Sequence, residues 1–186
     1  MDTVRQACHH LRQHLNVIKY YLSSGKTEDL KSYIEQYRMT LPPDTARTWC
    51  ENYAVNTIVC YYGEEARKAG IDFSVRLELP KQLSINEPEL CSILGNLLEN
   101  ALDACRECTD TAPFIRIRAR EESGHIALAV DNTCRSAPIE ENGQFRSTKH
   151  EGFGTGTASV RAIAQRHQGV AEFHYENGIF YASVFI

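Results

Sequence analysis

The fold of this chain is decided by one stretch, residues 89–105: Glu-Leu-Cys-Ser-Ile-Leu-Gly-Asn-Leu-Leu-Glu-Asn-Ala-Leu-Asp-Ala-Cys. Pro88 precedes it and suits the first turn of a helix, where the missing N–H of proline costs nothing. Apolar residues then recur at helical spacing and form one broad face: Leu90, Ile93, Leu94, Leu97, Leu98, Ala101 and Leu102. Asn96 and Asn100 lie one turn apart on the same side of this helix. Because buried amides are costly unless something bonds to them, the pair is either plainly exposed or part of a binding site.

A glycine-containing segment further along the chain favours the binding site. Ser147-Thr148-Lys149 is followed by Phe153-Gly154-Thr155-Gly156-Thr157, which stands directly before another helical pattern. Glycines that open a helix can present backbone N–H groups to phosphates. The two motifs together predict a site for a ligand that carries phosphate.

The composition is that of an ordinary soluble globular protein, with 42% hydrophobic and 24% charged residues. A length of 186 residues allows one substantial core, or a small core plus an appendage. The net charge is −4 and the basic residues are scattered, so we expect no nucleic-acid partner. No apolar run approaches the ~18–20 residues that span a bilayer, and no signal peptide opens the chain. Any membrane sensor is therefore expected upstream, outside this chain.

Two groups of residues have some features of a metal site. The chain has seven cysteines, an odd number, which we expect to be reduced and mostly buried thiols. Cys105-x-x-Cys108 has the spacing of zinc ligands, but no second pair at ligand spacing follows it. Cys8-His9-His10 with His14 is the other group, and on a helix these side chains point in several directions. We expect zinc at neither place.

The first 43 residues predict an antiparallel helical hairpin. A helix is expected from about residue 3 to 24, with apolar residues at alternating steps of four and three: Val4, Cys8, Leu11, Leu15, Ile18 and Leu22. A turn at Gly25 ends it, and a second helix to about residue 40 has the same spacing in Leu30, Ile34, Tyr37 and Leu41. Two helices alone bury too little apolar surface. The seam therefore predicts pairing with a second copy, which makes a dimeric four-helix bundle.

Pro42-Pro43 breaks the second helix and marks the boundary to a second domain, residues 44–186. Helices are expected at about 51–69, 89–105 and 156–167, and a strand at about 71–79. Strands at 115–119 and 126–130 are expected to form a hairpin that turns at Ser123-Gly124, and Asn177-Gly178 is expected to turn a second hairpin between the last two strands. The residues between about 133 and 151 form a polar loop without clear periodicity. A sheet on one side and three helices on the other make an α/β sandwich. The predicted fold class is therefore α+β, a helical hairpin followed by this sandwich.

The motifs resemble those of a known family. Asn96-Leu-Leu-Glu-Asn100-Ala resembles the N-box of GHKL-type ATP-binding domains, which have the Bergerat fold, and Gly154-Thr-Gly156 resembles their second glycine box. By the order and spacing of these boxes, the chain is similar to the cytoplasmic part of a sensor histidine kinase over residues 4–186. It is most similar to the peptide-pheromone and LytTR-regulator-coupled kinases of Gram-positive bacteria.

The resemblance implies that ATP and Mg²⁺ are bound between the two boxes. Asn100 is implied as the Mg²⁺ ligand, which suits a cation that prefers hard oxygen ligands. Asn96 is implied to support the phosphates. Gly154 and Gly156 would let the backbone approach the phosphates at the start of a helix.

The resemblance also implies a lid and an adenine reader. Residues 133–153 would cover the nucleotide, and within them Thr148 and Lys149 would contact it, with Lys149 offering a positive charge. Structureless loops of this length are usually functional or disordered. The reader should stand at the end of the preceding strand, where Asp131 and Asn132 both qualify. Strand alternation puts them on opposite faces, so only one can read adenine, and Asn132 is preferred because the closest relatives have Asn there.

Residues 8–15, Cys-His-His-Leu-Arg-Gln-His-Leu, resemble the family's acceptor box, Arg-His-Asp-Leu-Arg-His-His-Leu. The match implies that His9 is phosphorylated, with His10 and His14 as alternatives. His10 replaces the family acid, which would orient the acceptor ring and take its proton, and Cys8 replaces the preceding Arg. A neutral His10 can accept a proton, but it has no standing negative charge. We therefore expect reduced autokinase activity.

Asn96 distinguishes two types of reaction. The chaperone and gyrase branches of the superfamily carry Glu there, which activates water, whereas an amide cannot act as a base. The resemblance therefore implies an ATP-dependent protein-histidine kinase that phosphorylates His9 and then an Asp of a response regulator, such as one of the LytTR type. The expected location is the cytoplasmic part of a membrane-anchored bacterial receptor. The alternative is a non-catalytic dimeric scaffold with weak nucleotide binding, which the altered acceptor box and the absence of glycines after Asn132 favour.

Overall fold

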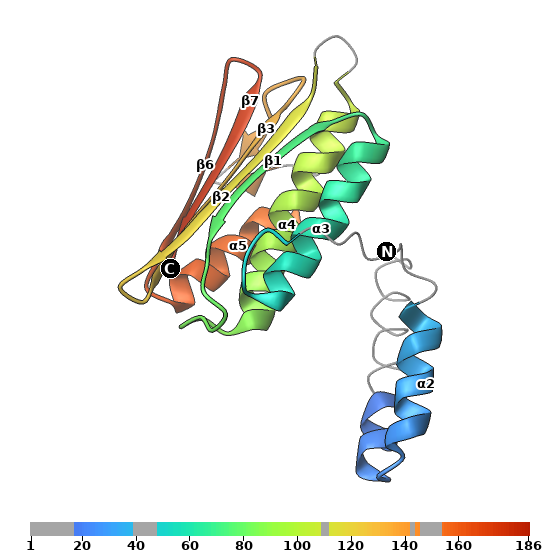
Figure 1. The fold of residues 1–186 in the computed structure, drawn as a ribbon. Helices are drawn as coiled ribbons and strands as arrows, with labels where there is room; N and C mark the ends of the chain where they lie inside the picture. Colours follow the sequence, from blue (N-terminus) through green and yellow to red (C-terminus); the bar gives the residue numbers. More distant parts are fainter. Residues whose placement is uncertain (1–16, 39–47, 109–111, 142–143, 146–153) are drawn as a thin grey trace. The chain divides into compact units, whose positions relative to one another are not determined.

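The chain divides into two compact units, Met1–Asp44 and Thr45–Ile186 (Figure 1). The computed structural model describes residues 17–38, 48–108, 112–141, 144–145 and 154–186. Within these ranges, no helix combines the length and the apolar character that crossing a bilayer requires.

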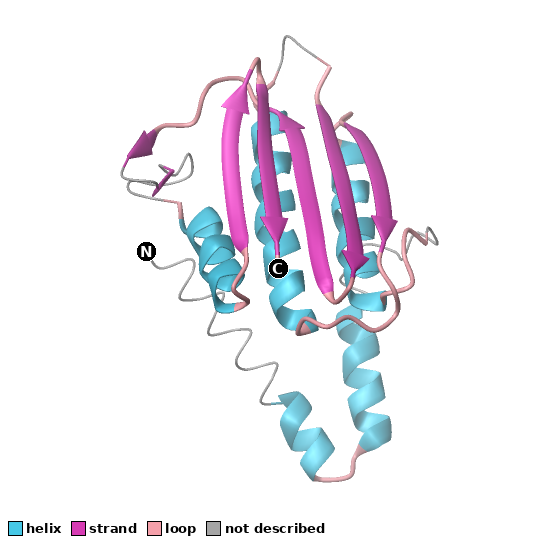
Figure 2. Ribbon diagram, turned by 90° about the vertical axis from the view of Figure 1, so that its left-hand side faces the viewer, coloured by secondary structure: helices cyan, strands magenta, loops and turns pink. Residues whose placement is uncertain are grey.

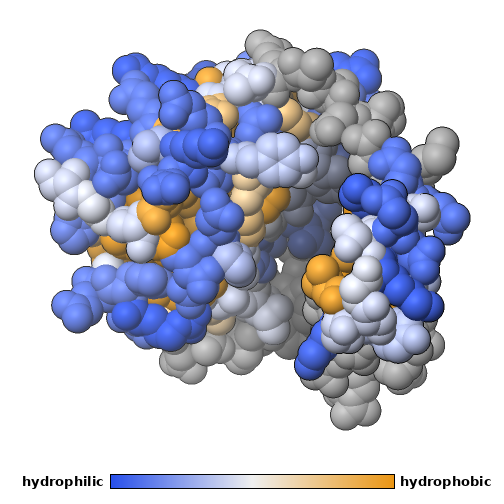
Figure 3. All heavy atoms as spheres, turned by 60° about the horizontal axis from the view of Figure 1, so that its bottom comes forward, coloured by the Kyte–Doolittle hydropathy of each residue, from blue (hydrophilic) through white to orange (hydrophobic). Residues whose placement is uncertain are grey.

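The described part of the first unit contains two helical segments, residues 17–23 and α2 (Thr27–Arg38), on either side of a turn at Gly25. Gly25 has φ +66°, which glycine adopts at little cost, and its N–H donates to the carbonyl of Leu22. Leu30 is buried, whereas Leu22 is 65% and Ile34 is 47% exposed. Hydrophobic side chains are therefore visible on the surface of this unit (Figure 3). The expected helix before residue 17 lies outside the described residues.

Within its described residues, the second unit is a two-layer sandwich in which three helices pack against one face of a five-stranded sheet (Figure 2). Its strands are, in spatial order, β1 (Asp72–Glu78), β2 (Phe114–Glu122), β3 (His125–Thr133), β7 (Ile179–Phe185) and β6 (Val170–Glu176). β1 runs parallel to β2, and the other neighbouring strands are antiparallel. One face of the sheet is covered by α3 (Tyr53–Lys68), α4 (Glu87–Arg106) and α5 (Thr155–Arg166). The predicted α/β sandwich is confirmed.

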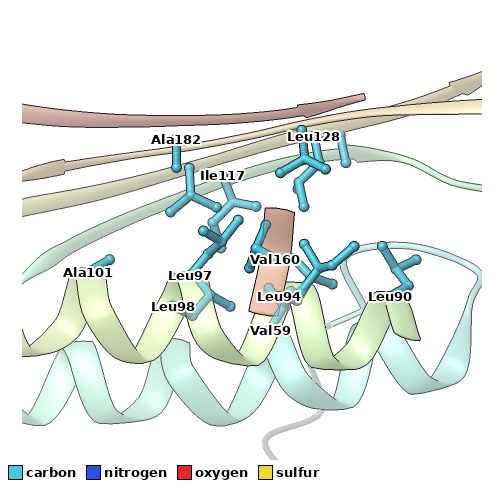
Figure 4. Close-up of a cluster of buried hydrophobic side chains, with 14 of the residues drawn as sticks. Val59, Leu90, Leu94, Leu97, Leu98, Ala101, Ile117, Leu128, Val160 and Ala182 are labelled. Carbon is cyan, nitrogen blue, oxygen red and sulfur yellow. The ribbon is translucent and has the colours of Figure 1, made fainter. Parts of the chain in front are cut away.

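The predicted helix at residues 89–105 is α4, and it packs against α3, α5 and the sheet. Its buried face is made of Leu90, Ile93, Leu94, Leu97, Leu98, Ala101, Leu102 and Cys105. The sheet meets this face with alternate residues of its strands, among them Ile117, Leu128 and Ala182 (Figure 4). Burying one leucine side chain contributes about 1.5–3 kcal/mol, so this face is a main source of the stability of the unit. The position of α4 is thereby fixed, and with it the position of its polar side.

Tight turns join the strands of the two predicted hairpins. Ser123 and Gly124, between β2 and β3, have φ +55° and +82°. Asn177 and Gly178, between β6 and β7, have φ +50° and +80°. Positive φ at both central residues matches the twist of the flanking antiparallel strands. Both hairpin predictions are confirmed.

A small second sheet follows β3, where the sequence predicts only a polar loop. It pairs β4 (Glu140–Glu141) with β5 (Gln144–Phe145) in antiparallel orientation. Two-residue strands are too short to show the alternation that identifies a strand in a sequence. The same loop leads on toward the start of α5.

Candidate functional site

The predicted asparagine pair on α4 meets the glycine turn at the start of α5. A Cβ atom added to Gly156 would lie 3.1 Å from Asn100 Nδ2 and 3.2 Å from Asn96 Oδ1. The amide nitrogen of Asn96 donates to the carbonyl of Ser92 at 2.7 Å, so its oxygen is free to face Gly156. Asn100 is exposed, and Asn96 is half-buried. Asn96, Asn100 and Gly156, from two motifs far apart in the sequence, thus form one cradle, in which a side chain on residue 156 would require the amides to shift by a few tenths of an ångström.

The first turn of α5 offers backbone donors to this cradle. Its N-cap, Gly154, has extended backbone angles (φ −68°, ψ 131°) and no side chain to bind the first N–H groups of the helix. The N–H of Gly154 itself donates to the carbonyl of Phe145 at 2.8 Å, so Gly154 contributes the turn and not a donor. The N–H groups of Thr155, Gly156 and Thr157 follow, and the first turn contains no acidic residue. A helix start of this kind attracts anions.

Asp131 and Asn132, the two candidates at the end of β3, lie on opposite faces of the sheet. The carboxylate of Asp131 accepts a hydrogen bond from Arg118 at 2.6 Å, on the face that no helix covers. Asn132 is buried, and its partners in the sheet, Ile115 and Phe180, point toward the helices. Of the two residues, Asn132 therefore lies on the same side of the sheet as α4 and α5.

Cys105 links the end of α4 to the ends of β2 and β3. Its thiol lies within hydrogen-bonding distance of the carbonyl oxygens of Phe114 (3.2 Å) and Thr133 (3.4 Å). Burial raises the pKa of Cys105 to about 12, so the thiol stays protonated at neutral pH. The thiol of Cys108 donates to the carbonyl of Ala104 at 3.4 Å. Over the described ranges, no cluster of three or more His, Cys, Asp or Glu side chains could hold a metal ion.

Phe145 supports the site, although its sequence pattern does not single it out. The residue is buried, and its ring packs edge-on against Phe173 and Phe180, with centroids 6.0 and 5.6 Å away. The guanidinium of Arg161, on α5, lies 5.0 Å from the centre of the Phe173 ring and 5.8 Å from that of Phe145. Since the carbonyl of Phe145 also accepts a hydrogen bond from the N–H of Gly154, this cluster is joined to the N-cap of α5. The feature of the sequence from which this role could have been predicted is an isolated aromatic residue within a polar segment.

Some predicted site residues lie outside the described ranges, namely His9, His10, His14, Thr148 and Lys149. The acceptor box and the Ser-Thr-Lys motif therefore stay predictions, as do the roles given to them. The part of the site that the structure assembles comes from α4, the start of α5 and the end of β3.

A hollow of about 610 Å³ lies elsewhere, on the open face of the sheet. Ala127, Ala129 and Ser183 are among its lining residues, together with Arg118 and Phe185. It contains none of the predicted site residues and faces away from the helices. The candidate site is instead an open cradle at the surface, with Asn100 at its exposed side.

Residues 85–186 match the family model of the GHKL domain. The C4-dicarboxylate transport sensor protein DctB of Rhizobium meliloti (strain 1021) is 36% identical over 114 residues, which cover 58% of this chain and 18% of DctB. Sensor histidine kinase NatK of Bacillus subtilis (strain 168) is 26% identical over 186 residues, covering 95% of this chain and 57% of NatK. The chain thus spans 57% or less of the length of these curated relatives.

Solved structures of histidine kinases share the fold. The catalytic domain of histidine kinase ThkA, in a nucleotide-free form, has a TM-score of 0.56 at 20% identity and covers 72% of this chain and 90% of that chain. ThkA in complex with response regulator protein TrrA has a TM-score of 0.54 at 14% identity and covers 100% of this chain and 60% of that chain. The family match over residues 85–186 includes every described residue of the cradle and Asn132. This chain therefore belongs to the GHKL domain family.

Proposed function

We propose that this chain is part of a sensor histidine kinase that transfers the γ-phosphate of Mg·ATP to His9 and then to an aspartate of a response regulator. The observation that carries the proposal is the contact of Gly156 with the amides of Asn96 and Asn100. It combines backbone donors for phosphates with amide oxygens suited to a hard cation. Membership of the GHKL family and the naming of NatK as a sensor histidine kinase support it.

The cradle suits a nucleotide with Mg²⁺, because glycine at position 156 lets the backbone donors at the start of α5 come close to the two amides. The oxygen of Asn100 would hold the cation, which when bound neutralises charge on the phosphate oxygens during transfer. The N–H groups of Gly156 and Thr157 would bind the phosphates, and Asn96 would support them. Asn132 would accept a hydrogen bond from the exocyclic amine of adenine.

Three other predicted residues complete the proposed site. Thr148 and Lys149 would contact the nucleotide from residues 133–153, with Lys149 adding a positive charge. Asp131 is the less suitable adenine reader, because Arg118 already holds its carboxylate on the open face. The neutral amide of Asn132 bonds less strongly than a charged carboxylate would, so we expect weak ATP binding.

The proposed transfer forms a bond between a ring nitrogen of His9 and the γ-phosphorus and breaks the bond from that phosphorus to the oxygen of ADP. The imidazole of His9 loses a proton, for which neutral His10 is the acceptor in place of the family acid. Asn96 cannot act as a base toward water. Transfer to a protein group is therefore favoured over ATP hydrolysis.

The proposed partners are a second copy of the chain and a response regulator. Leu22 and Ile34 belong to the predicted seam and are exposed in a single chain, which favours their burial in a dimeric four-helix bundle. The fold likeness to ThkA, whose structure was solved with response regulator TrrA, supports the second partner, which we take to be of the LytTR type. The relatives extend beyond the matched segments. An upstream membrane sensor, with this chain on its cytoplasmic side, is therefore part of the proposal.

A non-catalytic dimeric scaffold that binds nucleotide weakly is the second candidate. Cys8 and His10 stand where the acceptor box of the family has Arg and an acid. No glycine follows Asn132 directly, in contrast to most of the superfamily. Both departures would lower kinase activity while leaving the fold intact.

The test is incubation of the purified chain with γ-labelled Mg·ATP, beside the variants His9→Gln and Asn100→Asp. Acid-labile, base-stable label on the parent but not on His9→Gln would support the kinase and its acceptor together. Label that persists on His9→Gln would move the acceptor to His10 or His14. Nucleotide binding without label would favour the scaffold, and steady phosphate release without phosphoprotein would favour hydrolysis. Unchanged nucleotide affinity in Asn100→Asp would contradict its role with Mg²⁺.

A further inference from the structure

The two ends of α5 are both attached to the same side of α4. At the start of α5, Gly156 lies against Asn96 and Asn100. At its end, Glu89 in the first turn of α4 is bonded to Arg166 Nη2 at 2.7 Å and to His167 Nε2 at 2.7 Å. Glu89 shares a side of α4 with the asparagine pair, because steps of seven and four residues return to the same face of a helix. α5 is therefore attached to α4 at two points, at the carboxylate of Glu89 and at the asparagine pair of the candidate site.

The middle of α5 is held to the core by buried apolar side chains. Val160, Ile163 and Ala164 are buried there, and such apolar packing is not directional. A helix of 12 residues is a rod of about 18 Å, so a small shift or tilt at one end is carried to the other. At Gly156 the fit leaves less than a methyl group of space. A displacement of α5 would therefore change the cradle directly.

The electrostatics of the two helices favour this attachment. Glu89 lies at the positive N-terminal end of α4, and Arg166 with His167 lies at the negative C-terminal end of α5. The hydrogen bond from Arg166 and, to a smaller extent, the hydrogen bond from His167 hold the pKa of Glu89 below its ordinary value. The carboxylate is thus ionised at neutral pH, with one oxygen for each partner.

We propose that Glu89 is a positioning residue that sets the distance between the first turn of α5 and the asparagine pair, and thereby the affinity for the nucleotide. This inference rests on the proposed function, because it assumes that phosphates bind in the cradle. Glu89 itself touches no ligand in this scheme. It acts through α5, from the far end of the helix.

Glu65 provides a matched control. It is a carboxylate on α3 that is bonded to Lys68 at 2.7 Å and to Arg106 of α4 at 3.4 Å. The side chain of Glu65 is 23% exposed and that of Glu89 is 27% exposed. Both therefore link α4 to a neighbouring helix from the surface, but only Glu89 holds α5. A purely structural role would make their replacements equivalent.

The experiment compares Glu89→Gln with Glu65→Gln in the full chain. Binding of a fluorescent ATP analogue with Mg²⁺ is titrated, and the thermal midpoint of each variant is measured. We expect similar small losses of thermal stability, with nucleotide affinity about three- to tenfold weaker in Glu89→Gln only. Arg166→Gln should weaken binding in the same way, and combining it with Glu89→Gln should add little further loss. Equal affinities in both glutamine variants, whether lowered or unchanged, would overturn the proposal.

Hydrogen exchange of the nucleotide-free chain separates this inference from the proposed function. Amides of residues 155–160 should exchange faster in Glu89→Gln than in the parent and in Glu65→Gln, because the start of α5 is released from α4. If the parent binds no nucleotide, the proposed function fails while this exchange still tests the attachment. Unchanged exchange at residues 155–160 in Glu89→Gln would overturn the positioning role, and Arg166→Gln serves if Glu89→Gln does not fold.

Discussion

Gly156 is the residue at which the candidate site tolerates the smallest change. An added methyl group would press on both amides, at 3.1 and 3.2 Å, whereas alanine is the better helix former. We expect Gly156→Ala to weaken nucleotide binding roughly tenfold or more, with the free energy of unfolding within about 1 kcal/mol of the parent. A titration with a fluorescent ATP analogue and urea unfolding measure the two effects.

Gly95 is the control for this prediction, since it lies on the same site helix, α4. An added Cβ there would meet no atom within 4 Å. Gly95→Ala should stabilise the fold by up to about 1 kcal/mol and leave nucleotide affinity unchanged. Equal affinity of the two alanine variants would show that Gly156 does not border the nucleotide.

Asn52 is fully buried, and all of its side-chain bonds serve the packing of α3 and α4. Its oxygen accepts from the N–H of Val55 at 3.0 Å, and its nitrogen donates to the carbonyl of Lys81 at 3.1 Å and to Glu87 at 2.9 Å. Asn52→Ala removes the N-cap of α3 and leaves the buried N–H of Val55 without its partner, which should cost about 2–4 kcal/mol. Urea unfolding followed by circular dichroism gives this value. A loss below about 1 kcal/mol would mean that water replaces these bonds.

Cys105 should be the least reactive of the described thiols. It is 1% exposed, and burial raises its pKa to about 12, so almost none of it is thiolate at pH 8. We expect iodoacetamide to modify Cys105 far more slowly than Cys60 or Cys91 in the folded chain, and at a comparable rate in urea. Peptide mass spectrometry over time measures this order. Rapid labelling of Cys105 in the folded state would show that the end of α4 opens.

At the scale of elements, the carboxylates that link α4 to its neighbours make stability depend on pH. Arg166 and His167 lower the pKa of Glu89, and Lys68, with a smaller effect of Arg106, lowers that of Glu65. A carboxyl whose pKa is lower in the folded state stabilises the fold above its unfolded pKa, about 4.3, and loses this effect as the pH falls through its folded pKa. Urea midpoints should therefore fall between about pH 5 and pH 3. In a variant with both Glu89→Gln and Glu65→Gln, that fall should be shallower, and an identical pH profile would contradict this account.

Elements with strong local signals could be predicted from the sequence. α4 has eight buried positions at helical spacing, and Asn177-Gly178 has the positive φ angles of a tight hairpin turn. β4 and β5 could not be predicted, because two-residue strands have no period. The parallel pairing of β1 with β2 could not be predicted either, because it depends on how α4 packs between the two strands in the chain and not on any residue within β1.

The candidate site was predictable to a similar extent. Asn96, Asn100 and Gly156 belong to motifs whose residue types suit the binding of phosphate and Mg²⁺, and the structure brings them together. Alternation along β3 separated Asp131 from Asn132, and it puts Asn132 on the same face as Ile126, Leu128 and Val130, which the helices cover. The bond from Arg118 and the attachment of Glu89 to Arg166 join residues on different elements, so only the tertiary structure reveals them.

For the whole molecule, the first unit should decide the oligomeric state. Leu22 is 65% exposed although it lies in the predicted seam, and a charge there would be buried in a dimer. We expect Leu22→Glu to convert the proposed dimer to a monomer, while Ser23→Glu, at a neighbouring exposed position, leaves the proposed dimer intact. Size-exclusion chromatography with light scattering measures the mass. A monomeric parent chain would contradict the dimer.

The place of β7 in the sheet has a consequence for how the protein is made. β7 follows β6 in the chain, yet it lies inside the sheet between β6 and β3. While the ribosome is still producing the chain, β3 therefore has one unpaired edge until residues 179–185 have emerged. The unpaired N–H and C=O groups of such a strand can bond to strands of other chains. The nascent protein is therefore most prone to aggregation just before its synthesis reaches β7. Messages truncated in this region should yield insoluble products, even though every residue of the cradle is already present.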